Sequence, residues 1–184
     1  LYKNNLKGWD IGYISTPLKE YIDQITDRSL RILIPGAGSG YEAEYLYKKG
    51  FTRTYYLDFS EEAIKTFREK HTDFPPENII FEDFFEHSGQ YDLILELASF
   101  TSIIPEKRET LAKKMYELLT PGGKYAGVFF DREFGYDHPP FGAFKENYIE
   151  LVKDLLHIKT LEPAYNSIKP REGRELFFIF QKEG

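Results

Sequence analysis

The sequence has no cysteine, a single methionine and a single tryptophan among its 184 residues. Without thiols the chain can form no disulfide, no thiolate metal site and no cysteine nucleophile. It also has no apolar run near the ~20 residues that a membrane-spanning helix needs, and no signal peptide is visible. We therefore expect no membrane association and a cytoplasmic location, which the lack of cysteine fits.

Basic charge is scarce as well. The 24 lysine and arginine residues are outnumbered by 30 aspartate and glutamate residues, which gives a formal net charge of −6. No basic cluster stands out against this balance, so nucleic acid is not expected as a partner. The 4 histidines follow no metal-ligand spacing, which predicts that no metal is bound. Of these, His71 and His87 are expected to be solvated.

Aromatic residues, by contrast, are plentiful. They make up 17% of the chain, with 16 Phe and 14 Tyr, and hydrophobic residues make up 41%. A chain of this length can bury a substantial core, and some of the rings are expected to line a pocket as well. Because no repeat, low-complexity tract or linker interrupts the sequence, we interpret residues 1–184 as one domain.

Apolar stretches of strand length alternate with stretches of helical spacing, which predicts an α/β fold with a mostly parallel sheet. The expected strands are 31–34, 53–59, 78–82, 91–96 and 124–130, followed by two final strands at 157–163 and 175–182. The expected helices are 18–26, 41–49, 60–71, 105–119 and 145–156. The T-P-G-G sequence at 120–123 predicts a turn between a helix and a strand.

A glycine-rich loop follows the first strand, with Gly36, Gly38 and Gly40 at alternate positions. Glycines allow positive φ angles and a close approach of a ligand, and the following helix directs its free N–H groups toward the loop. The dinucleotide fingerprint G-x-G-x-x-G would need a third glycine where the chain has Tyr41. The spacing G-x-G-x-G is common in S-adenosylmethionine (SAM) methyltransferases. On this motif alone, a dinucleotide site and a turn without a ligand remain open.

Carboxylates end the second and third strands. Asp58 can accept hydrogen bonds from both hydroxyls of a ribose, in a dinucleotide site or a SAM site, or from nearby backbone N–H groups. Asp83 can reach an adenine amino group, and Phe84 offers an aromatic face to the ring. The alternative for that pair is an exposed loop carboxylate beside a core aromatic residue.

The order of these motifs resembles the class I SAM-dependent methyltransferases over about residues 30–130. The segments "GWDIG" (8–12), "HPPF" (138–141) and "PREGRE" (170–175), with Pro35 before the glycines, narrow the resemblance. They are similar to the thiopurine/thiol S-methyltransferase family, including its halide and thiol methyltransferase branch. The resemblance spans nearly the whole chain. It implies a Rossmann-like fold with a seven-stranded, mostly parallel sheet, a C-terminal antiparallel hairpin and helices on both faces.

The resemblance also implies which residues bind SAM and its product, S-adenosylhomocysteine (SAH). Trp9 belongs to an N-terminal segment and helix, 1–28, that covers the cofactor. The other implied contacts are Gly36 and Gly38 at the methionine part, Asp58 and Phe59 at the ribose, Asp83 and Phe84 at the adenine, and Glu96 and Leu97 near the methionine end. Leu97 stands where the thiopurine branch often has an arginine, which weighs against a thiopurine-like acceptor. Because the family's helix ahead of Trp9 is absent or truncated, we expect native residues that close the site to be missing and the pocket to be open.

The resemblance implies methyl transfer by in-line displacement to a small soft nucleophile, namely a thiol, a thiopurine or a halide-like anion. SAM carries the electrophilic methyl group, and such acceptors need no strong base, so no catalytic side chain is predicted. The alternatives are an NAD(P)-dependent Rossmann oxidoreductase and a non-catalytic SAM-binding module. A small-molecule acceptor is the expected partner, and we expect a monomer.

The acceptor is expected beneath the segment 131–144, which is rich in glycine, proline and aromatic residues. Phe100, Phe130 and Tyr136 are predicted to form an apolar pocket, with core packing as the alternative for Phe130. Arg171 can attract an anionic acceptor or be an ordinary surface charge.

Overall fold

The computed structural model describes residues 13–97 and 99–184. Its helices are α2 Thr16–Asp23, α3 Tyr41–Lys48, α4 Glu61–Lys70, α5 Arg108–Leu118 and α6 Lys145–Val152. Its strands are β1 Ile32–Pro35, β2 Thr54–Asp58, β3 Ile79–Phe81, β4 Tyr91–Leu97, β5 Leu119–Phe130, β6 His157–Pro163 and β7 Glu175–Gln181. Short 3-10 turns are η2 Pro76–Asn78, η3 Phe84–Glu86, η4 Phe100–Ser102, η5 Pro105–Lys107 and η6 Lys169–Arg171. Trp9 and the rest of "GWDIG" lie outside the described residues.

All seven strands form one sheet in the order β3-β2-β1-β4-β5-β7-β6. The first five strands in this order are parallel, and β7 pairs antiparallel with both β5 and β6. The mostly parallel sheet and the C-terminal antiparallel hairpin are therefore confirmed. Insertion of β7 between β5 and β6 also departs from the six-stranded order 3-2-1-4-5-6 of dinucleotide-binding Rossmann folds.

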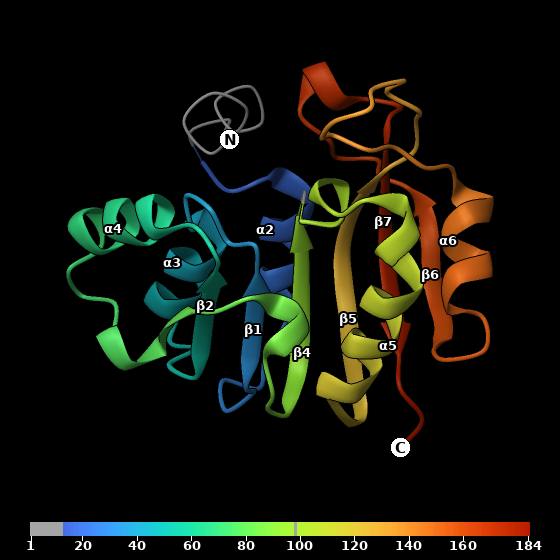
Figure 1. Ribbon diagram of the computed structural model, residues 1–184. Coiled ribbons are helices and arrows are strands. Elements are labelled where there is room, and N and C mark those ends of the chain that lie inside the picture. The colour runs from blue at the N-terminus through green and yellow to red at the C-terminus, as the bar shows by residue number, and fades with distance from the viewer. Residues whose placement is uncertain (1–12, 98) are drawn as a thin grey trace.

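Helices cover both faces of the sheet, with α2, α3 and α4 on one face and α5 and α6 on the other (Figure 1). Each face has its own hydrophobic cluster. One includes Leu18, Leu46 and Phe67 from the first three helices, and the other includes Met115 from α5 and Tyr148 from α6. This arrangement confirms the predicted layers. Of the helices among the described residues, none is long and apolar enough to cross a bilayer.

The start of β5 differs from the prediction. The T-P-G-G sequence belongs to the strand, which begins at Leu119 instead of position 124. The pairing with β4 shifts there, because Tyr91 pairs with Leu119 while Leu93 pairs with Lys124. Proline and glycine thus form a bulge within β5 instead of a separate turn, and glycine commonly marks such bulges.

Candidate functional site

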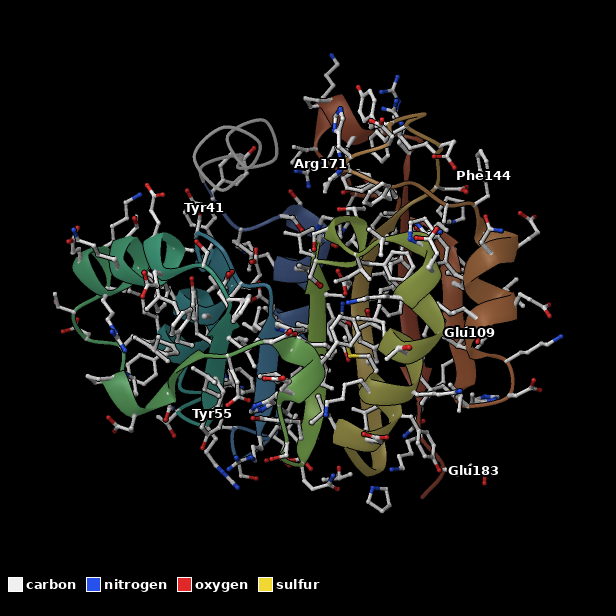
Figure 2. All side chains as sticks on the ribbon, in the orientation of Figure 1. Tyr41, Tyr55, Glu109, Phe144, Arg171 and Glu183 are labelled. Carbon is white, nitrogen blue, oxygen red and sulfur yellow. The ribbon has the colours of Figure 1, made fainter. Side chains whose placement is uncertain are left out.

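Apart from Trp9, which lies outside the described residues, the predicted cofactor residues lie at or just after the carboxyl ends of β1, β2, β3 and β4. In an open α/β sheet a ligand binds at this edge, near the strands where the chain order reverses; here these are β1 and β4. Tyr41, at the start of α3, and Arg171 lie toward this end of the molecule, whereas Tyr55 lies toward the opposite end (Figure 2). A small hollow between the ends of β1 and β4 is lined by residues that include Gly36, Ala37 and Leu97.

The backbone of the glycine loop needs its glycines. Gly36, Gly38 and Gly40 have φ angles of 59°, 55° and 74°, a region that side chains with a Cβ rarely adopt. A Cβ at Gly40 would lie 2.3 Å from the Phe67 ring, and one at Gly36 would lie 2.7 Å from Cβ of Ser99. Gly40 is therefore explained by close packing of α3 and α4, whereas Gly36 is exposed at the predicted site.

Asp58 brings the end of β2 to the glycine loop. Its Oδ2 accepts a hydrogen bond from the backbone N–H of Gly38 at 2.9 Å, and its Oδ1 accepts one from the N–H of Ser60 at 2.9 Å. Asp58 thus accepts hydrogen bonds from nearby backbone N–H groups, which is one of the two roles that the sequence left open for it. Because a carboxylate has about four acceptor positions, these two bonds leave capacity for hydroxyls of a ligand.

An exposed aromatic pair lies beside Asp58. Phe59 is 68% exposed and stacks on Phe81, which is 52% exposed, with the ring centroids 5.9 Å apart. Phe81 was not singled out from the sequence. Phe81 could have been identified from its position near the end of a predicted strand. In the structure this strand is β3, and Phe81 pairs with Asp58 of the neighbouring strand β2.

Asp83 begins the turn after β3. Its Oδ1 accepts a hydrogen bond from the N–H of Phe85 at 2.9 Å, so it caps η3. Phe84 is half-buried and packs edge-on against Phe85. The backbone N–H of Glu82 donates to the carbonyl of Asp58 at 3.2 Å, which ties this turn to the end of β2.

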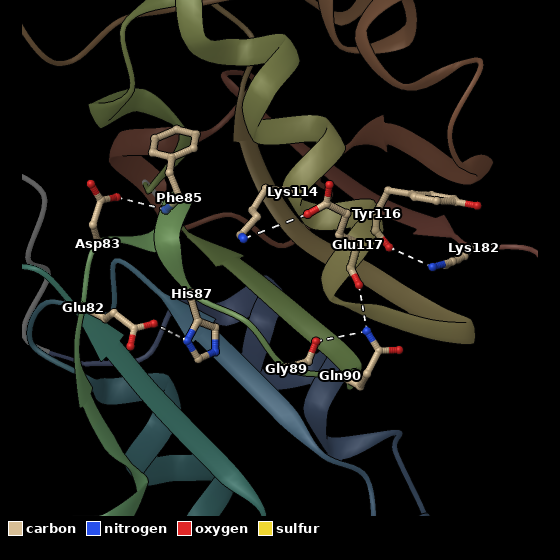
Figure 3. A network of polar contacts seen from close by, with 10 residues as sticks. All are labelled: Glu82, Asp83, Phe85, His87, Gly89, Gln90, Lys114, Tyr116, Glu117 and Lys182. Carbon is tan, nitrogen blue, oxygen red and sulfur yellow. Dashed lines mark hydrogen bonds and ion pairs between the residues drawn. The ribbon is translucent and has the colours of Figure 1, made fainter.

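His87 is buried, so the prediction that it is solvated is wrong. Its Nδ1 lies 2.7 Å from Oε1 of Glu82 (Figure 3), and its Nε2 lies 2.8 Å from the hydroxyl of Tyr91. The imidazole thereby links the two ends of the β3–β4 connection. The prediction for His71 is wrong as well, since His71 is half-buried against Phe67 and contacts Glu44.

Glu96, near the end of β4, is fully buried. Its Oε2 accepts hydrogen bonds from the hydroxyl of Ser99 at 2.7 Å and the N–H of Phe100 at 2.8 Å. Its Oε1 accepts one from the hydroxyl of Tyr125 at 2.6 Å. Burial raises the pKa of the Glu96 carboxyl, against the opposing effect of these donors. Burial also raises the pKa of Tyr125 well above its usual value.

The predicted acceptor residues occupy different environments. Phe100 is 2% exposed and packs in the core against Phe129 and Tyr148. Tyr136 is 52% exposed and stacks on His138, with ring centroids 4.8 Å apart.

Phe130 and Arg171 lie together. The guanidinium carbon of Arg171 is 5.6 Å from the centre of the Phe130 ring, and its Nη1 lies 3.4 Å from Oε2 of the buried Glu175. Arg171 is therefore not an ordinary surface charge, because its side chain is only 12% exposed and its charge faces a carboxylate.

In a chain without cysteine, a metal ion would need several histidine, aspartate or glutamate side chains close together. Among residues 13–97 and 99–184, no three His, Asp or Glu side chains are grouped so as to hold a metal ion.

Comparison with known families gives a match over almost the whole chain. The model of the thiopurine S-methyltransferase family matches residues 1–179. Thiocyanate methyltransferase 1 of Brassica oleracea is 29% identical, over 95% of this chain and 79% of that protein. Probable thiol methyltransferase 2 of Arabidopsis thaliana is 26% identical, over 91% of this chain and 76% of that protein.

Solved structures share the fold at low sequence identity. The 1,6-didemethyltoxoflavin-N1-methyltransferase of Burkholderia thailandensis, solved with SAH, has a TM-score of 0.78 and 15% identity and covers 100% of this chain and 84% of its own. A SAM-dependent methyltransferase of Methanosarcina mazei has a TM-score of 0.71 and 18% identity, over 89% of this chain and 97% of its own. The class I methyltransferase fold and the family resemblance are thus confirmed. The chain belongs to the thiopurine S-methyltransferase family and is a SAM-dependent methyltransferase.

Proposed function

We propose that this enzyme transfers the methyl group of SAM to a small soft nucleophile, a thiol or a thiocyanate- or halide-like anion. The observation that carries the proposal is the match to the thiopurine S-methyltransferase family over residues 1–179. The relatives named for thiocyanate and thiol acceptors, which align over more than 90% of this chain, support the same acceptor class. Leu97, where the thiopurine branch often has an arginine, favours these acceptors over a thiopurine.

The residues at the carboxyl edge fit SAM. Asp58 retains acceptor capacity for the ribose hydroxyls next to Gly38, and the exposed ring of Phe59 offers an apolar face beside it. Asp83 and Phe84 follow β3 on the neighbouring turn, where the adenine is proposed to lie. Gly36, exposed beside the hollow between β1 and β4, is proposed to contact the methionine part, with Leu97 at the other side of that hollow. Trp9 is proposed to cover the cofactor from the N-terminal segment.

SAM, when bound, supplies an electrophilic methyl group on a sulfonium centre. The protein's task is then to align the acceptor in line with the C–S bond and to exclude water. A thiolate or a thiocyanate ion is already nucleophilic, so the proposal assigns no general base. We propose that 131–144, with Tyr136 and Phe130, provides the apolar surface for the acceptor. Polarisable anions are well suited to such a surface because their hydration is weak.

The proposal is tested by measuring methyl transfer from labelled SAM to a panel of thiols, thiopurines, iodide and thiocyanate. We expect turnover with a thiol or with one of the anions, and lower turnover with thiopurines. Turnover with none of them, despite SAH binding, would support a non-catalytic SAM-binding module. In a thermal-shift assay SAH should stabilise the protein, because a ligand at about 100 times its Kd adds about 2.7 kcal/mol. Stabilisation by NADH but not by SAH would contradict the proposal.

A further inference from the structure

The carboxylate of Glu96 is enclosed by protein donors on both oxygens. Ser99 and Phe100 donate to Oε2, and Tyr125 donates to Oε1. The side chain has no solvent exposure, although it belongs to the strand end where the cofactor's methionine part is proposed to lie. Glu96 is among the residues that line the hollow next to Gly36, but both of its oxygens accept hydrogen bonds from the protein itself. These donors join the end of β4 to β5 and to the turn that follows β4.

That turn lies directly against the glycine loop. The space beside Gly36 is so narrow that an added Cβ would come within 2.7 Å of Cβ of Ser99. Ser99 is held in place by its hydrogen bond to Glu96. The spacing between the glycine loop and the turn after β4 therefore depends on the buried carboxylate.

The same turn also meets the loop proposed to cover the acceptor. The carbonyl of Thr101 accepts a hydrogen bond from the N–H of Phe141 at 2.9 Å. The ring of Phe100 is fixed in the core by Phe129, with centroids 5.2 Å apart, and by the guanidinium of Arg108 at 4.9 Å. Residues 99–102 thus lie between the glycine loop and the segment 131–144.

We propose that Glu96 is a positioning residue and not a cofactor ligand: through Ser99 and Phe100, and with Tyr125 holding its other oxygen, it sets the distance between the cofactor loop and the acceptor loop. This inference rests on the proposed function for the identity of the two loops. A methyl transfer in line with the C–S bond depends on that distance. The geometry of the reaction is thereby fixed by a group that touches neither reactant.

The test compares Glu96→Gln with Glu96→Ala. A glutamine can keep the network, because its oxygen accepts from Ser99 and Phe100 while its amide N–H donates to the oxygen of Tyr125. We expect Glu96→Gln to retain the SAH dissociation constant and kcat/KM for the acceptor within about threefold, and Glu96→Ala to lose about tenfold or more in kcat/KM. If Glu96 instead contacted the cationic amino group of the cofactor directly, Glu96→Gln would weaken SAH binding about tenfold or more.

Hydrogen exchange provides a readout that needs neither cofactor nor turnover. In the protein without SAH, we expect the amide of Phe100 to lose protection in Glu96→Ala and to keep it in Glu96→Gln. If Glu96→Ala fails to fold, Tyr125→Phe removes one donor at constant shape and should also reduce this protection. Tyr116→Phe, on the exposed face of α5, is the matched control and should leave exchange unchanged.

Three results would overturn the inference: loss of SAH binding in Glu96→Gln, equal protection of Phe100 in all variants, or no difference in kcat/KM between glutamine and alanine at position 96. Failure of the wild-type protein to bind SAH would instead contradict the proposed function. The two failures are therefore distinguishable.

Discussion

At the scale of single residues, Asp58 connects three parts of the proposed cofactor site. Its side chain accepts hydrogen bonds from the N–H groups of Gly38 and Ser60, and its backbone carbonyl accepts one from Glu82. It therefore joins the glycine loop, the start of α4 and the turn after β3. The sequence left two roles open for this carboxylate, and the structure shows that the local role exists without excluding the ribose role.

We predict that Asp58→Ala weakens SAH binding by about 1–3 kcal/mol, because hydrogen bonds to a buried polar partner are lost. Isothermal titration calorimetry measures the change. The Asp73→Ala variant, at an exposed loop position, is the control and should bind like the wild type. Circular dichroism of Asp58→Ala checks that loss of the carboxylate, which accepts from two backbone N–H groups, leaves the fold intact. An unchanged affinity would remove Asp58 from the cofactor site.

At the scale of elements, the β3–β4 connection is held from within by side chains. Glu82, His87 and Tyr91 form a chain of hydrogen bonds across it. Gln90 donates to the carbonyl of Glu117 at the end of α5 (Figure 3). A connection with a single 3-10 turn, η3, thereby keeps a defined position next to Asp83. The hydrophobic pattern could not indicate this, because His87 is a polar residue surrounded by polar neighbours in the sequence.

We predict that His87→Ala lowers the free energy of unfolding by about 1–3 kcal/mol, because the buried hydroxyl of Tyr91 loses its hydrogen bond to the imidazole. Urea denaturation followed by far-UV circular dichroism measures this change. His157→Ala, at an exposed position on the edge strand β6, should shift stability by no more than about 0.5 kcal/mol. Equal effects of the two substitutions would show that the Glu82–His87–Tyr91 hydrogen bonds do not stabilise the fold.

At the scale of the whole molecule, burial of carboxyl groups makes stability depend on pH. Burial raises the pKa of Glu96 and Glu175 above their usual value of 4.5. A raised pKa means that the folded protein binds the proton more tightly than the unfolded chain does. The contribution of such a group to stability is therefore fully present below about pH 4.5 and is lost as the pH rises through the folded-state pKa.

We predict that the wild type loses stability relative to Glu96→Gln as the pH rises above about 4.5. Glutamine keeps the shape of the side chain but does not ionise, so the pH-dependent loss is absent from the variant. Urea denaturation of both proteins between about pH 4 and pH 8 measures the difference. Glu162→Gln, exposed on β6, should follow the wild type. A pH-independent difference between wild type and Glu96→Gln would mean that Glu96 titrates alike in the folded and unfolded states.

The sequence by itself determined the class of fold, the family and the cofactor. Strand-length apolar runs, alternating glycines and carboxylates at strand ends are local patterns, and each reports a local backbone requirement such as the positive φ of Gly36. Tyr41, in place of the third glycine of the dinucleotide fingerprint, counted against a dinucleotide. The order of the other motifs then favoured SAM.

Only the tertiary structure decided which polar groups are buried and what they contact. The environment of Glu96 depends on Tyr125, from another strand, and that of His87 depends on Glu82 and Tyr91 across a turn. The bulge in β5 likewise exists because Leu119 pairs with Tyr91. Such contacts join residues distant in the chain, and their energies depend on burial, which no local pattern of residues specifies.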